Sequence, residues 1–92
     1  MEIDKVQLLI LSILEDMGAT TPGTGMTLRE IGTEVNKSDD NKFVQKTINR
    51  KVINLKERGC VNFKMKMNKA KLYYITAKGK ELKGVLFTED EK

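Results

Sequence analysis

Three side chains near the middle of the chain are suited to reading the edges of DNA bases: Lys46, Asn49 and Arg50. At about 100° per residue, this spacing places them on one side of an α-helix. Arginine forms paired hydrogen bonds with guanine, and asparagine does so with adenine, so this set could distinguish bases in the major groove. Gln45 lies at the flank of the strip and could reach a base or a phosphate.

Residues 41 to 58 predict the helix that carries this strip. The opposite side is apolar and can be buried, because it gathers Val44, Ile48, Val52 and Leu55. Ser38, Asp39 and Asp40 are all suitable N-caps, and we favour the two acids because they also suit the positive end of a helix. Gly59 ends the helix. The alternative is a surface helix whose lysines are simply solvated.

The positive charge of the chain is unevenly distributed along its 92 residues, which carry a net charge of +4. Residues 41 to 83 contain thirteen Lys or Arg and two acids, whereas residues 1 to 40 contain three against eight. This concentration predicts binding to a polyanion. A membrane surface fits less well, because no basic segment also carries a strong, exposed apolar face.

Residues 61 to 75 predict a β-hairpin. Residues 60 to 67 alternate between apolar and polar side chains, as expected of a half-buried strand. The apolar members of that strand, which we expect to pack, are Val61, Phe63, Met65 and Met67. Residues 68 to 71 form a polar turn, and residues 72 to 75 return as the second strand.

The second strand can face inward in two ways: with Tyr73 and Ile75, or with Leu72 and Tyr74. We favour the first pair. Several lysines could contact phosphates or the minor groove. One precedes the base-reading strip and the others lie on the outer face and tip of the hairpin: Lys42, Lys64, Lys66, Lys69 and Lys71.

Residues 3 to 17 predict the first helix, with one broad apolar side: Ile3, Val6, Leu9, Ile10, Ile13, Leu14 and Met17. Leu8 and Leu11 lie off this side, next to acids, and need cover from another surface. We expect a homodimer contact through these leucines, with packing inside one chain as the alternative. Gly18 is placed to cap the end of the helix.

Thr27 and Glu30 are spaced as a capping box at the start of a second helix, residues 28 to 36. Gly32 lies in the middle of this helix, where glycine costs about 1 kcal/mol relative to alanine, and the close approach of another helix would explain it. The preceding loop, residues 18 to 26, lacks the Gly-Lys-Ser/Thr ending of a phosphate-binding loop, so we interpret it as a connection.

Thr76 is a suitable N-cap for a last helix, residues 77 to 87. Gly79 and Gly84 weaken this helix, so we expect it to pack on the body, against the first helix. Residues 88 to 92 predict a flexible polar tail. The whole chain, residues 1 to 92, is expected to form one domain.

Two stretches of the sequence resemble known bacterial regulators. Residues 47 to 61, TINRKVINLKERGCV, resemble the recognition helix of MarR-like and PadR-like proteins. Residues 73 to 79, YYITAKG, are similar to the segment that ends the wing in those families. The resemblance covers residues 27 to 82 and implies an α+β, mainly helical, winged helix-turn-helix fold. The chain departs from it at residues 68 to 71, where MarR-like proteins usually carry an Asp-x-Arg pair.

The resemblance and the residues together predict a sequence-specific double-stranded DNA-binding protein, acting as a small bacterial or phage transcriptional regulator. The helix of residues 41 to 58 would enter the major groove and the hairpin would act as the wing. The alternative is a winged-helix module that binds protein and not DNA. We expect a homodimer through the first helix and the C-terminal helix. The short C-terminal helix argues against a small-molecule effector.

The sequence gives no indication of an enzyme, a metal site or a cofactor. It contains no histidine and one cysteine, Cys60, which the resemblance places at a core position. We expect a cytoplasmic protein, because the N-terminus lacks the basic start of a signal peptide and one cysteine forms no internal disulfide.

Overall fold

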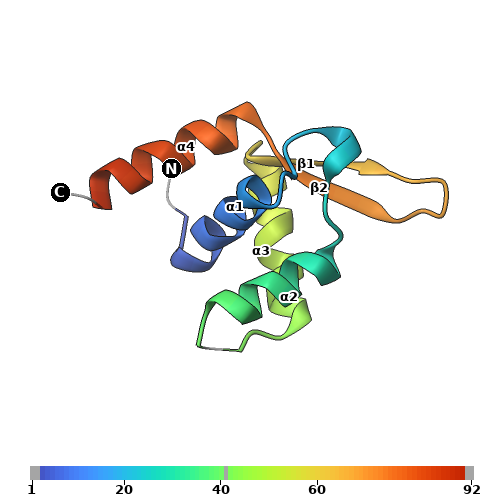
Figure 1. Ribbon diagram of the computed structural model, residues 1–92, viewed down its shortest axis with the longest axis horizontal. Coiled ribbons are helices and arrows are strands. Elements are labelled where there is room, and N and C mark those ends of the chain that lie inside the picture. Colours follow the sequence, from blue (N-terminus) through green and yellow to red (C-terminus); the bar gives the residue numbers. More distant parts are fainter. Residues whose placement is uncertain (1–2, 41, 91–92) are drawn as a thin grey trace.

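The chain folds into three packed helices with a β-hairpin on one side and a fourth helix on the other (Figure 1). The computed structural model describes residues 3 to 40 and 42 to 90, except for the side chains of residues 86 to 90. The elements, in chain order, are α1 (Lys5–Asp16), the short 3₁₀ helix η1 (Pro22–Thr24), α2 (Leu28–Ser38), α3 (Gln45–Glu57), β1 (Val61–Met65), β2 (Lys71–Ile75) and α4 (Ala77–Asp90). In the described part of the chain, the helices are too short and too polar to cross a membrane.

The core lies between α1, α2, α3 and the base of the hairpin. Its fully buried large side chains are Ile10, Leu11, Leu14, Ile31, Val35, Ile48, Val52, Leu55, Cys60, Val61 and Ile75. Leu11 is fully buried within one chain, so the expectation that a second chain covers it is wrong. The helix that carries it, α1, is in contact with α2, α3, α4 and β2. A helix surrounded in this way buries residues beyond the single apolar side that the sequence predicts. Leu8 is half-buried.

The two ends of α1 are set by local hydrogen bonds. Asp4 is the N-cap and forms a capping box with Gln7. At the other end Met17 is the C-cap, and Gly18 follows at a φ of +78°, as predicted. Met17 is 56% exposed, so its predicted place in the core is wrong, because α1 ends at Asp16 and Met17 is its C-cap.

The turn between α2 and α3 is longer than expected. The capping box of Thr27 and Glu30 is present, but α2 continues to Ser38, and Asp39 is its C-cap and not the N-cap of α3. The side chain of Asn36 pairs with the backbone of Phe43, accepting from its N–H at 2.8 Å and donating to its C=O at 3.0 Å.

This pairing holds the chain extended before α3, so the helix begins at Gln45 and Val44 is its N-cap. Val44 is 67% exposed and does not belong to the buried stripe. The predicted helix start at residue 41 is therefore wrong, since residues 42 to 44 lie outside the helix; residue 41 itself is outside the described residues. Ile48, Val52 and Leu55 are buried as predicted.

The hairpin pairs β1 with β2 in an antiparallel register that places Phe63 opposite Tyr73 and Val61 opposite Ile75. Tyr73 and Ile75 are buried, which confirms the favoured inward pair. Leu72, on the other face, is buried as well, because the backbone of Gly25 packs directly against it.

The same register corrects the idea that the hairpin lysines share one outer face. Lys64 pairs with Leu72 and so lies on the face of the η1 loop, whereas Lys71 pairs with Met65 on the opposite face, with Phe63. Met65 and Met67 are 51% and 105% exposed, so their predicted packing is also wrong. The hairpin extends past the body of the protein here (Figure 1).

The start of α4 is tied to the end of α3. The Thr76 hydroxyl caps α4 by accepting from Gly79 N–H at 3.1 Å, and donates to Gly59 C=O at 2.6 Å. The helix then packs on α1, as predicted, where Lys83 forms an ion pair with Glu15. It continues to Asp90, so most of the predicted tail is helical; residues 91 and 92 lie outside the described residues.

Candidate nucleic-acid interface

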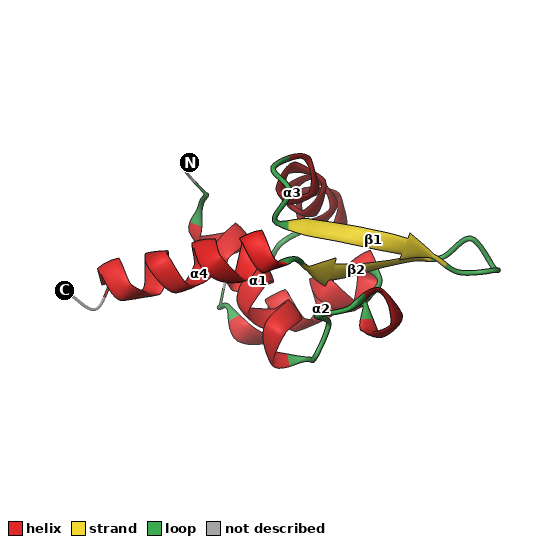
Figure 2. Cartoon of the chain, turned by 90° about the horizontal axis from the view of Figure 1, so that it is seen from above, coloured by secondary structure: helices red, strands yellow, loops and turns green. Residues whose placement is uncertain are grey.

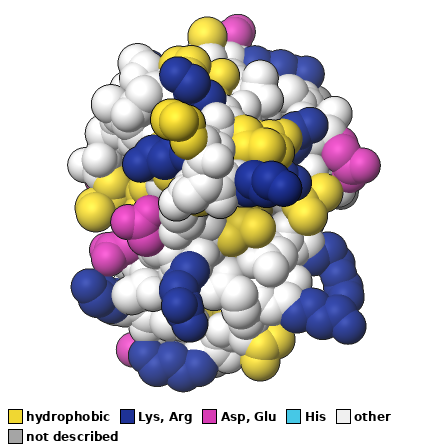
Figure 3. Space-filling model, turned by 90° about the vertical axis from the view of Figure 1, so that its right-hand side faces the viewer, with side chains coloured by type: hydrophobic (Ala, Val, Ile, Leu, Met, Phe, Trp, Pro, Cys, Tyr) yellow, Lys and Arg dark blue, Asp and Glu magenta, His cyan; other side chains and the backbone are white. Residues whose placement is uncertain are grey.

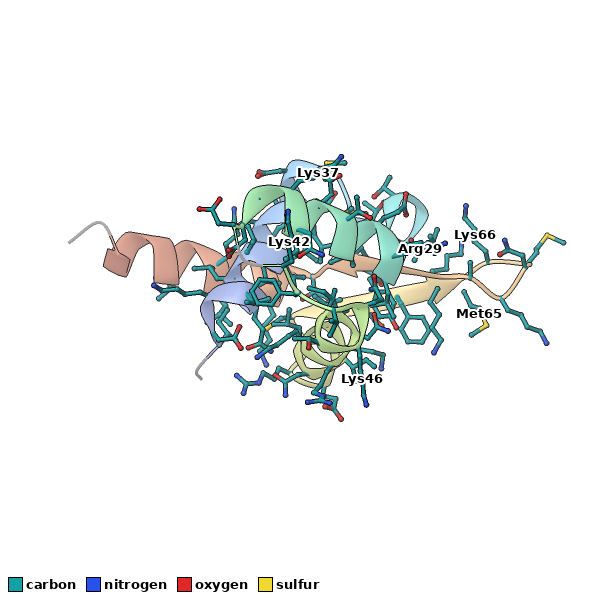
Figure 4. All side chains as sticks on the ribbon, turned by 90° about the horizontal axis from the view of Figure 1, so that it is seen from below. Arg29, Lys37, Lys42, Lys46, Met65 and Lys66 are labelled. Atoms are coloured by element: carbon teal, nitrogen blue, oxygen red, sulfur yellow. The ribbon has the colours of Figure 1, made fainter. Side chains whose placement is uncertain are left out.

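The outward side of α3 is accessible along its length. Lys46, Arg50 and Ile53 are exposed there, and Asn49 is half-buried beside them. The side chains that face the core are Ile48, Val52 and Leu55, which are fully buried. Lys46 lies on the side of α3 that faces away from α2 (Figure 4). The structure therefore brings the predicted base-reading residues together on one open side of the helix.

The flank of α3 that faces α1 is fixed by polar contacts. Gln7 is only 5% exposed, and its Nε2 donates to Asn54 Oδ1 at 2.8 Å and to Lys51 C=O at 3.4 Å. Lys51 also pairs with Asp4. Burial by itself would raise the pKa of Asp4, but the Lys51 ammonium and the Gln7 backbone N–H bond to its carboxylate and hold the pKa below its usual value.

The flank of α3 that faces α2 is fixed by Gln45. Its Nε2 donates to Leu28 C=O at 2.8 Å and to Asn49 Oδ1 at 2.8 Å. Its amide lies against Gly32, where an added Cβ would be 2.7 Å from Gln45 Oε1. The close approach predicted from this mid-helix glycine is therefore confirmed, and the side chain at the interface is Gln45.

The hairpin extends beside α3, which lies on the β1 side, while α2 lies on the β2 side (Figure 2). Phe63 is the aromatic centre of its inner face, 5.4 Å from the Tyr73 ring. Two ammonium groups lie over the Phe63 ring, that of Lys56 from α3 at 5.3 Å and that of Lys71 at 5.0 Å. This stack joins α3 to the hairpin and places the Lys71 charge on the side of the helices.

The tip of the hairpin is a tight turn in which Lys66 N–H and C=O bond to Ala70 C=O and Lys69 N–H, both at 2.8 Å. Lys69 has a φ of +65°, and its side chain and that of Lys66 are exposed. Lys66 and Met65 project to opposite sides of the hairpin (Figure 4). Viewed from this tip, Lys and Arg side chains spread over the molecule, with exposed hydrophobic side chains between them (Figure 3).

Lys42 and Arg29 lie on the α2 side of the surface (Figure 4). Lys42 precedes α3 and is not part of it, and its Nζ donates to Asn36 C=O at 2.7 Å. Arg29 is exposed near the start of α2, and in the described chain it forms no ion pair with Glu57.

Sequence reasoning missed the contacts that hold α3 in place. The pair Gln7–Asn54 joins residues far apart in sequence, and no local pattern reveals it. One signal was available, because Asp4-x-x-Gln7 has the spacing of a capping box and would have marked Gln7 as more than a surface residue.

Cys60 is fully buried, and burial raises the pKa of its thiol although Lys78 and Arg58 nearby oppose that shift. The described side chains contain no cluster of three or more His, Cys, Asp or Glu that could hold a metal ion.

Solved structures with this architecture include a candidate DNA-binding protein from Ralstonia eutropha, with 19% identity and a TM-score of 0.69 over 94% of this chain and 99% of that one. MepR, a transcription regulator of the Staphylococcus aureus multidrug efflux pump MepA, has 18% identity and a TM-score of 0.73 over 98% of this chain. A point mutant of MepR has 18% sequence identity to this chain and a TM-score of 0.70.

The chain spans 62% of the MepR length. No protein-family model matches the chain, and no curated protein matches its sequence. At 18 to 19% identity, the likeness to these structures establishes the fold, which is the winged helix-turn-helix predicted from the resemblance to MarR-like domains.

Proposed function

We propose that this chain is a sequence-specific double-stranded DNA-binding protein, a bacterial or phage transcription regulator of the cytoplasm. In this proposal α3 enters the major groove and the β1–β2 hairpin acts as a wing along the flanking backbone. One observation carries the proposal: Lys46, Asn49 and Arg50 lie together on the open side of α3, while both flanks of the helix are tied to the body.

The residues on α3 divide by their chemistry. Arg50 is the candidate for paired hydrogen bonds to guanine, and Asn49 the candidate for a hydrogen bond to another base edge. Lys46 lies at the first turn of the helix, where it can reach a base or the adjacent phosphate. Ile53, 46% exposed in the same strip, offers an apolar contact to a thymine methyl group.

The wing lysines supply charge that does not depend on base sequence. Lys66 and Lys69 at the tip and Lys71 on the helix side are the candidates for phosphate or minor-groove contacts. Lys64 lies on the face of the η1 loop, so we expect it to contribute least. Lys42 and Arg29 would contact phosphates on the α2 side of the helix.

Selection of bound duplexes from a random pool tests the proposal. We expect a defined consensus sequence. The logarithm of the binding constant should fall by about 0.9 for each tenfold rise in salt concentration and each phosphate neutralised. Recovery of no duplex would contradict it. That result would favour the alternative, a winged-helix module that binds protein, because the charged surface would then bind no nucleic acid.

The burial of Leu11 reduces the surface available for the expected homodimer contact. Leu8 on α1 and the exposed part of α4 remain available. Leu82 and Val85 line a shallow apolar hollow on α4, and Val85 is 51% exposed. We propose that a second copy covers this hollow, since a two-fold dimer would match a palindromic site. Sedimentation should show a dimer that Val85→Glu converts to a monomer; a wild-type monomer would contradict it.

A further inference from the structure

The amide of Gln45 has both of its protons engaged within the protein. Nε2 donates one to Leu28 C=O, at the start of α2, and the other to Asn49 Oδ1, one turn further along α3. An amide nitrogen carries two protons and accepts none, so this nitrogen has no further capacity. Gln45 is exposed, yet its donor end is fully used by the fold.

These two bonds determine which way the Asn49 side chain faces. The Leu28 carbonyl only accepts, so the end of the Gln45 amide beside it must be the nitrogen. The remaining proton of that nitrogen needs an acceptor, so Asn49 must present its oxygen. The Asn49 Nδ2 group is thereby turned away from Gln45, and in the described chain it has no hydrogen-bond partner. The two ends of an asparagine amide have nearly the same shape, so an unconstrained Asn49 could adopt either direction.

Gly32 makes room for this arrangement. A Cβ at residue 32 would lie 2.7 Å from Gln45 Oε1 and 3.2 Å from both Cδ and Nε2 of the same amide. Glycine weakens a helix interior relative to alanine, and α2 nevertheless has glycine at this position. Because the atoms that a Cβ would meet belong to the end of a flexible side chain, alanine would displace Gln45 at little cost to the fold.

We propose that Gly32, Gln45 and Asn49 form an orienting relay in which Gln45 is a positioning residue and Asn49 is the base-reading residue. The relay rests on the proposed DNA-binding function and deepens it. It assigns to Gln45 a role in sequence discrimination without contact with DNA. Asn49 then reaches the duplex with the direction of its amide already fixed. It therefore prefers one base pair at the position it contacts.

Base discrimination in Gly32→Ala and Gln45→Leu tests the relay. Wild type should prefer one base pair opposite Asn49 by about fivefold or more over its alternatives. Both variants should reduce this preference to about twofold or less while the salt slope stays unchanged. The melting temperature of Gly32→Ala should equal or exceed that of wild type. Gly84→Ala is the matched control, since a Cβ there meets nothing within 4 Å, and it should keep the wild-type preference.

Gln45→Glu separates an orienting role from a merely structural one. A carboxylate accepts and cannot donate, so Asn49 should turn its Nδ2 group toward residue 45. The preferred base pair should then change and not merely weaken. In an Asn49→Ala background, neither Gln45→Leu nor Gln45→Glu should alter the preference further. A uniform loss on every duplex in Gln45→Leu, with the base preference unchanged, would make Gln45 a phosphate contact and overturn the relay.

NMR of the free protein tests the relay without DNA. The Gln45 side-chain NH₂ protons should exchange slowly in wild type and in Gly84→Ala, and rapidly in Gly32→Ala. Rapid exchange in wild type would overturn the relay even if the protein binds its site. A wild-type protein that selects no duplex would instead overturn the proposed function, and the reading role with it, while slow exchange would still show that the amide pair exists.

Discussion

The polar side chains of α3 and those of the wing are held in opposite ways. On α3, Gln45 and Asn49 bond to each other, and Asn54 is fixed by a nearly buried Gln7. On the wing, Lys66 and Lys69 make no side-chain hydrogen bond or ion pair with other described residues, and their ammonium groups are exposed. Fixed amides suit the directional pattern of base edges, whereas mobile ammonium groups suit phosphates, which accept from many directions. We therefore expect α3 to determine specificity and the wing to supply affinity.

The largest expected effect on binding to duplexes of any sequence is on the wing. Lys69→Ala with Lys71→Ala should lower affinity about 10- to 100-fold at low salt and flatten the log–log salt slope by about 2. The loss should be the same on specific and random duplexes, which a salt titration of both would show. Lys80→Ala, which removes one charge from α4, is the control. A loss confined to the specific duplex would reverse the roles assigned to the two regions.

Arg50→Ala should weaken binding to the selected site by about 1–3 kcal/mol and binding to random duplexes by less. The reason is that a paired contact with guanine is lost only where guanine is present. Competition between the two duplexes measures the difference. An equal loss on both would make Arg50 a phosphate contact, similar in kind to the wing lysines.

Gln7→Leu probes the scaffold that holds α3. Removing the Gln7 amide leaves Asn54 Oδ1 without its donor, so the free energy of unfolding should fall by about 1–3 kcal/mol. Chemical denaturation measures this loss, and Ser12→Ala on the same helix is a milder control. Unchanged stability would mean that α3 does not depend on α1 for its position.

The smallest expected effect concerns the ion pair between Asp4 and Lys51. The folded state lowers the pKa of Asp4, so this carboxylate stabilises the fold above its unfolded pKa, and the contribution is lost as the pH falls through the folded value. Asp4→Asn should cost less than about 1 kcal/mol at pH 7, because the pair is partly exposed, and nothing once Asp4 is protonated. Denaturation at pH 7 and below pH 3 compares the two. An equal cost at both values would assign the effect to helix capping and not to charge.

Local patterns in the sequence were sufficient where the responsible contacts are also local. The Thr27 capping box, the Gly18 cap and the buried Ile48, Val52 and Leu55 were predicted because neighbouring residues determine them. Gly32 was predicted to mark a close approach, because glycine is unfavourable in a helix interior without a reason.

Contacts made by loops and by the tertiary arrangement were the ones that the sequence did not reveal. The hydrogen bonds between Asn36 and Phe43 hold the chain extended, so α3 begins later in the chain than predicted and Val44 is not part of its buried side. The burial of Leu11 also depends on the tertiary arrangement, because the helix that carries it, α1, contacts four other elements. The exposed Met65 fails for a related reason, because alternation predicts a half-buried strand but not where the body beneath the hairpin ends.

Chemical-shift mapping with the selected duplex tests most directly whether α3 and the wing form the DNA-binding surface. On titration, the backbone amides of residues 45 to 53 and 64 to 71 should shift most, and those of α4 should stay near their free positions. Shifts concentrated on α4, with residues 45 to 53 unchanged, would contradict the assignment of α3 as the reading helix.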